Sequence, residues 1–273
     1  SEKFAGALHT YTIEAMMQDG KALQAATSHN LGQNFAKAFD TKYTDKNENI
    51  QYAWQTSWGM STRIIGGLIM THSDDKGLVL PPEIAPIKVV IIPILKDKED
   101  NTKLLSFVKK IKLGVKEIEI DVRDNMTPGA KYNEWEKKGV PIRLEVGQRE
   151  MESGSVVFVR RDIGKKDLVR VDDLVKVVKQ GLKDMQESLY KKSLDFRTKK
   201  TKTVDTWEDF KKEIINNNFI LAHWDGSAET EEKIKQETKA TIRCIPFDQA
   251  KEKGICVYSQ KPSKQRVLFA KTY

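Results

Sequence analysis

The run IKVVIIPIL, residues 87–95, constrains the fold more than any other stretch of this sequence. It is almost continuously apolar and rich in β-branched residues, which is typical of a strand that is buried on both faces. A helical pattern follows directly in NTKLLSFVKKIK, residues 101–112. Because a strand of this kind needs cover on both sides, we predict an α/β domain around it.

The patterns after this strand predict the rest of the same domain. Strands are expected in KEIEIDV, PIRLEVG and GSVVFVRRD, and an amphipathic helix from Val171 to Leu194. A proline-rich joint ends near Pro86, and a charge-rich tract, RTKKTKTVD at residues 197–205, is interpreted as a linker. We therefore predict an α/β domain at residues 86–196.

The flanking segments have a different character. HTYTIEAM, residues 9–16, alternates as a strand does and places Thr10, Thr12 and Glu14 on one polar face, which is either exposed or lines a site. After the tract, Thr206 and Asp209 fit the start of a capped helix, and further helix and strand patterns follow. The predicted fold class is α+β and α/β in several domains, with boundaries at 1–85, 86–196 and 197–273.

Composition narrows the class of protein. The formal net charge is +8, with the excess after residue 85, which suits a polyanion such as nucleic acid; a lysine-rich solvated surface is the open alternative. Only two cysteines occur, Cys244 and Cys256, so buried structural cysteines are favoured over a zinc site. No apolar run approaches the ~20 residues that span a bilayer. We expect a cytoplasmic protein with no membrane partner.

Three segments hold candidate functional residues. On its residues alone, His29 in QAATSHNLGQNFAKAF is interpreted as a structural histidine. Arg63 lies in the apolar run WGMSTRIIGGLIM, where a buried arginine would need an anion or a planar surface to stack on. In PIRLEV, Arg143 and Glu145 are expected on an exposed strand face. Trp135, Glu136 and Arg149 lie near them in sequence, and such a patch could bind unstacked bases.

Several long stretches together resemble one family. EKFAGA, TYTIEA, QAATSHNLGQNFAKAF, QTSWGMSTRIIGGLIMTHSDDKGLVLPP, YNEWEKKGVPIRLEVGQREM and RVLFAKTY resemble prolyl-tRNA synthetase in its eukaryote- and archaea-like form, over essentially the whole chain. The resemblance implies part of a class II antiparallel-sheet catalytic domain, an α/β anticodon-binding domain and a small α+β C-terminal domain. It also implies ATP, Mg²⁺ bound with ATP, L-proline and tRNA(Pro) as partners, and a homodimer for the full-length enzyme.

The resemblance also implies roles for individual residues. ATP contacts fall on Gln24, Thr27, Ser61 and Arg63; proline contacts on Phe4, His29, Trp58 and Gly59; anticodon contacts on Glu136, Arg143 and Arg149.

Two departures from the family qualify these expectations. The first two class II motifs would lie before EKFAGA, so we expect a C-terminal portion that is incomplete for catalysis on its own. The family's zinc cysteines would fall near AHWDG and ICVYS, where this chain offers Asp225, Cys256 and Tyr258, so we predict no structural zinc. The alternative to a ligase is a non-catalytic tRNA-binding or regulatory fragment.

Overall fold

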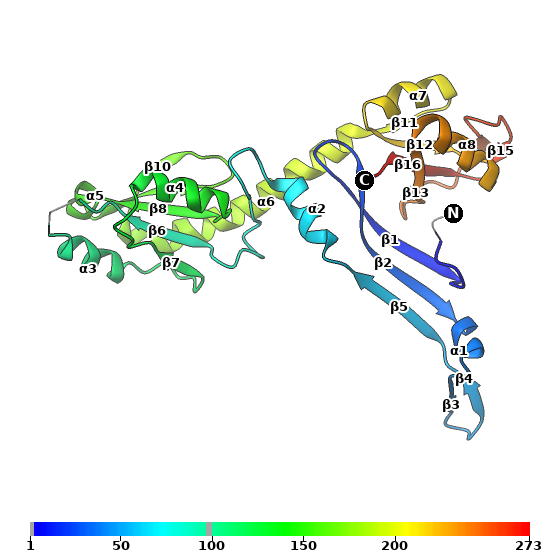
Figure 1. Ribbon diagram of the computed structural model, residues 1–273, viewed down its shortest axis with the longest axis horizontal. Helices are drawn as coiled ribbons and strands as arrows, with labels where there is room; N and C mark the ends of the chain where they lie inside the picture. The colour runs from blue at the N-terminus through cyan, green and yellow to red at the C-terminus, as the bar shows by residue number, and fades with distance from the viewer. Residues whose placement is uncertain (1–2, 97–99) are drawn as a thin grey trace. The chain divides into compact units, whose positions relative to one another are not determined.

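The chain divides into two compact units. The structure is a computed structural model that describes residues 3–96 and 100–273 (Figure 1). One unit comprises residues 72–194, and the other comprises residues 1–71 together with residues 195–273. The three-domain division at 1–85, 86–196 and 197–273 stays a prediction.

The unit of residues 72–194 is built on a mixed five-stranded sheet in the order β10-β9-β8-β6-β7. Strand β6, which lies between β8 and the edge strand β7, is parallel to both of its neighbours, and the two remaining pairings are antiparallel. The strands are β6 Val89–Pro93, β7 Ile118–Ile120, β8 Ile142–Val146, β9 Ser155–Arg160 and β10 Lys166–Arg170. The helices are α3 Thr102–Lys110, α4 Pro128–Lys137, α5 Gln148–Glu152, the 3₁₀ helix η1 Val171–Asp173 and α6 Leu174–Lys200.

Helices cover both faces of this sheet (Figure 1). Val89 and Ile91 point into a large core with residues of α3 and α6, whereas Val90 and Ile92 pack against Trp135 of α4. All five residues of β6 are buried, which confirms the prediction of a strand covered on both sides. Helix α4 begins at Pro128 because Thr127 caps it, its side chain accepting a hydrogen bond from the backbone N–H of Ala130.

The first part of the other unit is an antiparallel sheet in the order β1-β2-β5. Its strands are β1 His9–Met16, β2 Ala22–Gly32 and β5 Gln55–Met60, and a short ribbon pairs β3 Lys42–Thr44 with β4 Ile50–Tyr52. Helix α1 Asn34–Ala38 follows β2, and helix α2 Arg63–His72 follows β5 (Figure 1). This antiparallel arrangement agrees with the fold class that the sequence predicts.

The second part of this unit is a four-stranded sheet in the order β11-β12-β16-β13. One face packs against Phe210 of α7 and Ile234 of α8, and the other face packs against Met16 and Ala22 at the β1–β2 turn. The elements are β11 Thr201–Thr203, α7 Trp207–Ile215, β12 Phe219–His223, α8 Ala228–Thr238, β13 Ala240–Cys244, β14 Gly254–Ile255, β15 Pro262–Ser263 and β16 Arg266–Lys271.

The tract at residues 197–205 is not an irregular linker, so that interpretation is wrong. Helix α6 continues to Lys200, and residues 201–203 form β11, which pairs in parallel with β12. Lysine and arginine are good helix formers, and their charged ends stay in water on an exposed helix face. A cluster of positive charge therefore did not interrupt the helix. The capped helix start at Thr206 is confirmed, because its side chain accepts from the Asp209 N–H.

Candidate functional site

One face of the β1-β2-β5 sheet gathers polar side chains. The register aligns Thr10 with His29 and Ser57 in one row, and Thr12 with Thr27 and Gly59 in the next. Residues paired across strands point to the same side of a sheet. A shift in the register between Ile13 and Glu14 then places Gln24 opposite Glu14. The structure therefore brings Gln24, Thr27 and His29 onto one face.

His29 has defined contacts on this face. Its Nδ1 is 3.0 Å from the Thr10 hydroxyl, and the Phe4 ring lies over it with a centroid separation of 4.7 Å. The Phe4 N–H donates to the same Thr10 oxygen, and the Phe4 ring stacks on Phe35. Phe4 and His29, far apart in sequence, thus lie in contact, with the Phe4 ring as an apolar surface and the imidazole held by a hydrogen bond.

Trp58 and Gly59 take opposite sides of the sheet. Trp58 pairs with Ser28, so its side chain points to the face away from His29, where it is 76% exposed. Gly59 lies in the same row as Thr27, and a Cβ built on it would meet no atom within 4 Å. Of these two residues, only Gly59 shares the polar face.

Arg63 is exposed, so the premise of a buried arginine is wrong. It is the first residue of α2, and its backbone N–H donates to the hydroxyl of Ser61 at 3.3 Å. Helix α2 buries Gly67 instead, one turn further on. Within residues 3–96 and 100–273, no ion pair of the guanidinium is present. A permanently charged group at a helix N-terminus is well placed for an anion.

The other unit carries a buried charge cluster on β8, which the sequence placed on an exposed face. Arg143 and Glu145 are both buried, because α4 covers this side of the sheet. Arg143 donates to Glu136 at 2.9 Å and to Glu145 at 3.1 Å, and Lys166 donates to the second oxygen of Glu145 at 2.9 Å. The charges are therefore paired rather than solvated, as buried charges must be.

Sequence reasoning missed Tyr132 as a member of this cluster. Its ring lies 4.5 Å below the Arg143 guanidinium and 5.6 Å from the Lys166 ammonium. Burial raises the pKa of Tyr132 to about 12, so its hydroxyl stays protonated at neutral pH. The signal was available, because Tyr132 precedes Glu136 by one helical turn and so shares its helix face.

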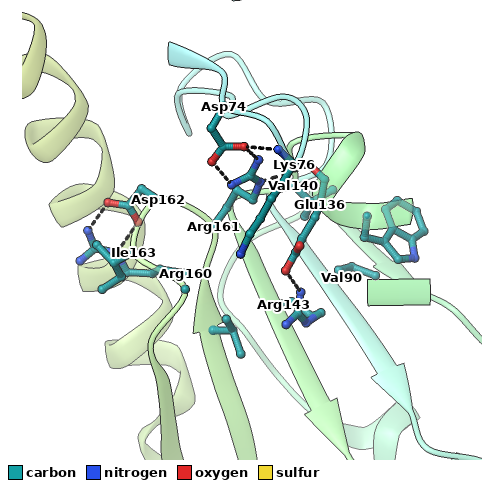
Figure 2. Close-up of a pocket in the computed structure, with 13 residues that line it drawn as sticks. Asp74, Lys76, Val90, Glu136, Val140, Arg143, Arg160, Arg161, Asp162 and Ile163 are labelled. Atoms are coloured by element: carbon teal, nitrogen blue, oxygen red, sulfur yellow. Dashed lines mark hydrogen bonds and ion pairs between the residues drawn. The ribbon is translucent and has the colours of Figure 1, made fainter. Parts of the chain in front are cut away.

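Glu136 and Arg143 line a pocket of about 150 Å³ (Figure 2). Arg161, directly after β9, closes one side through paired hydrogen bonds to Asp74 at 2.6 and 2.8 Å. These bonds lower the pKa of Asp74 to about 2. Arg161 also donates to the backbone oxygen of Glu136. The pocket therefore has a fixed, charged rim that the sequence did not reveal, since Asp74 and Arg161 are 87 residues apart.

Arg149 differs from the two other predicted anticodon residues. It is exposed on the short helix α5 and is not among the residues that line this pocket. Among the described residues, the structure shows no ion pair or hydrogen bond of its side chain. The structure thus brings Glu136 and Arg143 together and leaves Arg149 on the surface.

Comparison with known proteins places this geometry in a family. Residues 88–181 match the family model described as "Anticodon binding domain", and residues 207–273 match "Prolyl-tRNA synthetase, C-terminal". Relatives named proline–tRNA ligase from Phocaeicola vulgatus and Parabacteroides distasonis are 51% and 54% identical over 100% of this chain. The chain belongs to the prolyl-tRNA synthetase family. It spans 56% of the length of these two relatives and corresponds to a C-terminal portion.

A solved prolyl-tRNA synthetase has the same fold. The enzyme from Cryptosporidium parvum, crystallised with L-proline and AMP, superposes with a TM-score of 0.92 at 39% identity. The match covers 100% of this chain and 58% of that one. A second crystal structure of that synthetase, with halofuginone and AMPPNP, gives the same values. Within the described part of our chain, none of the helices is long and apolar enough to cross a membrane.

The Asp225 carboxylate accepts several hydrogen bonds in the C-terminal part of this chain. One carboxylate oxygen accepts from the N–H and hydroxyl of Ser227, and the other accepts from the hydroxyls of Thr230 and Ser259. Burial opposes the charge, but these bonds outweigh it and lower the pKa of Asp225 to about 2. In the residues that the structure describes, no group of three or more potential metal-ligating side chains occurs.

We expect Asp225→Asn to lower the free energy of unfolding by about 2 kcal/mol at pH 7, because the amide NH₂ cannot accept these bonds. The lowered pKa stabilises the fold above pH about 4, and this contribution disappears as the pH falls toward about 2. Thermal unfolding of both proteins should therefore converge at acid pH. Asp248→Asn, at an exposed aspartate of the same region, is the matched control. Equal stability of Asp225→Asn and the parent at pH 7 would contradict the prediction.

Proposed function

We propose that this chain is part of an enzyme that activates L-proline with ATP and transfers the prolyl group to the 3′ end of tRNA(Pro). In the first step the proline carboxylate attacks the α-phosphate of ATP, giving prolyl-adenylate and pyrophosphate. In the second step a ribose hydroxyl of the terminal adenosine attacks the adenylate carbonyl, and AMP leaves. The observation that supports this proposal best is the polar face with Phe4 over His29.

Phe4 and His29 suit a small imino acid. The Phe4 ring offers an apolar wall for the pyrrolidine ring, and the Thr10 hydroxyl fixes the orientation of the imidazole. Gly59 leaves open space in the adjacent row, and Trp58 would act from the other face of its strand. Positioning of the two reactants is a large part of the rate enhancement that such a site can provide.

The nucleotide would lie along the same face. Gln24 and Thr27 offer an amide and a hydroxyl, and Ser61 and Arg63 offer donors at the start of α2. The Arg63 guanidinium would stack on adenine and approach the phosphates. Mg²⁺ would arrive bound to the phosphates of ATP, where it neutralises the pyrophosphate leaving group, since the ion prefers phosphate and water oxygens.

The second unit would recognise the anticodon. At one pocket, Arg143 offers hydrogen-bond donors and Glu136 offers an acceptor. Guanine presents both acceptors and donors on its edges, so this combination fits it. Arg143 is already paired with two carboxylates, so it would hold Glu136 in place as much as contact a base. Arg149 is exposed and would contribute its charge directly to RNA.

The deciding experiment is proline-dependent exchange of labelled pyrophosphate into ATP by the full-length protein. We expect His29→Ala to raise KM for proline roughly tenfold, with a smaller effect on KM for ATP, because the imidazole borders only the proline pocket. His9→Ala is the matched control, since His9 belongs to the neighbouring strand β1 and lies on the opposite face of the sheet. Absence of exchange by the parent protein, with tRNA still bound, would favour a non-catalytic tRNA-binding fragment instead.

A further inference from the structure

A buried ion pair joins the C-terminal sheet to the polar face. The Glu14 carboxylate accepts from Arg243 Nε at 3.0 Å and from a terminal guanidinium nitrogen at 3.3 Å. The side chains of Arg243 and Glu14 are only 6% and 3% exposed. Arg243 belongs to β13, 229 residues further along the chain. A buried ion pair between residues so distant in sequence fixes β1 and β13 relative to each other.

The same carboxylate holds two side chains of the polar face. Glu14 Oε1 accepts from the Thr12 hydroxyl at 2.8 Å and from the Gln24 amide nitrogen at 3.4 Å. A carboxylate only accepts hydrogen bonds, so Gln24 must turn its NH₂ group toward Glu14. Its carbonyl oxygen is then the end that is presented away from Glu14, as an acceptor for a ligand donor.

Two β-bulges create this meeting point. On β2, Ala26 pairs with Ile13 and Gln24 with Glu14, so Ala25 is the extra residue. Without it, Gln24 would point to the face opposite Thr27. On β13, Ile242 pairs with Phe269 and Cys244 with Leu268, so Arg243 is itself the extra residue. Bulges redirect side chains and are frequent beside functional sites.

The side chains involved line an open space. Thr10, Thr12, Gln24 and Arg243 lie on the wall of one cavity of about 500 Å³. Arg243 also donates to the hydroxyl of Thr241, which fixes the guanidinium from its own strand. The guanidinium is therefore held by Thr241 of its own strand and by Glu14 of β1.

We infer that Arg243 is a positioning residue for ATP, acting through Glu14 on Gln24. This rests on the proposed function, in which Gln24 contacts the nucleotide. Arg243 fixes the orientation of the Glu14 carboxylate, Glu14 keeps the Gln24 carbonyl turned toward the ligand, and that carbonyl accepts from a donor of the nucleotide. The C-terminal sheet would thereby set the affinity for one substrate without touching it.

The test measures the kinetics of pyrophosphate exchange in the full-length protein. Arg243→Ala should raise KM for ATP about tenfold and leave KM for proline within about twofold, because Gln24, the residue that contacts the nucleotide, loses its orientation. Arg243→Lys keeps the charge and should give an intermediate value. In a Gln24→Ala background, Arg243→Ala should cause no further rise, since the residue through which it acts is gone.

Arg266→Ala is the matched control. Arg266 is a buried arginine of the same sheet that pairs with Asp205 and Glu252, away from the polar face. Its loss should lower the melting temperature without changing KM for ATP. Three outcomes would overturn the inference but leave the proposed function standing. In the first, Arg243→Ala raises KM for ATP and KM for proline together. In the second, its effect on KM for ATP adds fully to that of Gln24→Ala, and in the third, Arg266→Ala raises KM for ATP equally. No exchange by the parent protein would overturn the proposed function and the inference with it.

Discussion

Replacing Arg63 with lysine in the full-length protein is expected to lower kcat/KM for ATP about 100-fold in proline-dependent pyrophosphate exchange. Arg63 is exposed at the first residue of α2, and its guanidinium has no ion pair among the described residues, so the substitution breaks no folded-state contact that the structure shows. Lysine keeps the charge but loses the planar group that stacks on a base and the fork that fits phosphate oxygens. The loss would therefore report substrate contact and not stability.

The control for this prediction is Arg170→Lys, at an exposed arginine of β10 in the other unit. Both variants should melt at the temperature of the parent protein. A value of kcat/KM for Arg63→Lys within about threefold of the parent would contradict the role given to Arg63, because stacking and bidentate contact cannot be supplied by an ammonium group.

Local patterns predicted much of the fold. The apolar run around Val90 predicted a fully buried strand of the mixed sheet, and the start of α7 followed from Thr206 and Asp209. These features depend on neighbours within a few residues, so the sequence carries them directly. The same holds for the alternation of β1, whose polar face proved to carry Thr10 and Thr12.

Other features depend on partners that are remote in sequence. Alternation shows that Arg143 and Glu145 share a face, but not that α4 covers it. A period of two would also separate Gln24 from Thr27, which are three positions apart, and only the bulge at Ala25 unites them. Trp58 and Gly59 are adjacent, so they take opposite faces. The resemblance to a family names Gln24, Thr27, Trp58, Gly59 and Arg143, but it does not place them on the faces of a sheet.

Replacement of Arg143 and of Arg149 by alanine is expected to change different properties, namely the stability of the unit for Arg143 and the binding of tRNA for Arg149. Arg143→Ala leaves Glu145 buried with Lys166 as its remaining cationic partner, and Glu136 loses its hydrogen bond. Removing one partner of a buried pair costs about 3–5 kcal/mol, so the unit of residues 72–194 should open more readily. Amide hydrogen exchange of β8 measures this opening free energy directly.

Arg149→Ala should leave that opening free energy unchanged, since the side chain is exposed and unpaired within the described residues. It should instead weaken binding of tRNA(Pro) and reduce the dependence of log K on log[salt] by about one, as expected when one cation no longer meets a phosphate. Titrations of tRNA at several salt concentrations test this. The effect on binding separates recognition from folding, because Arg143→Ala changes both and Arg149→Ala only the first. Unchanged tRNA affinity in Arg149→Ala, or unchanged β8 protection in Arg143→Ala, would show that the corresponding arginine does not have the role assigned here.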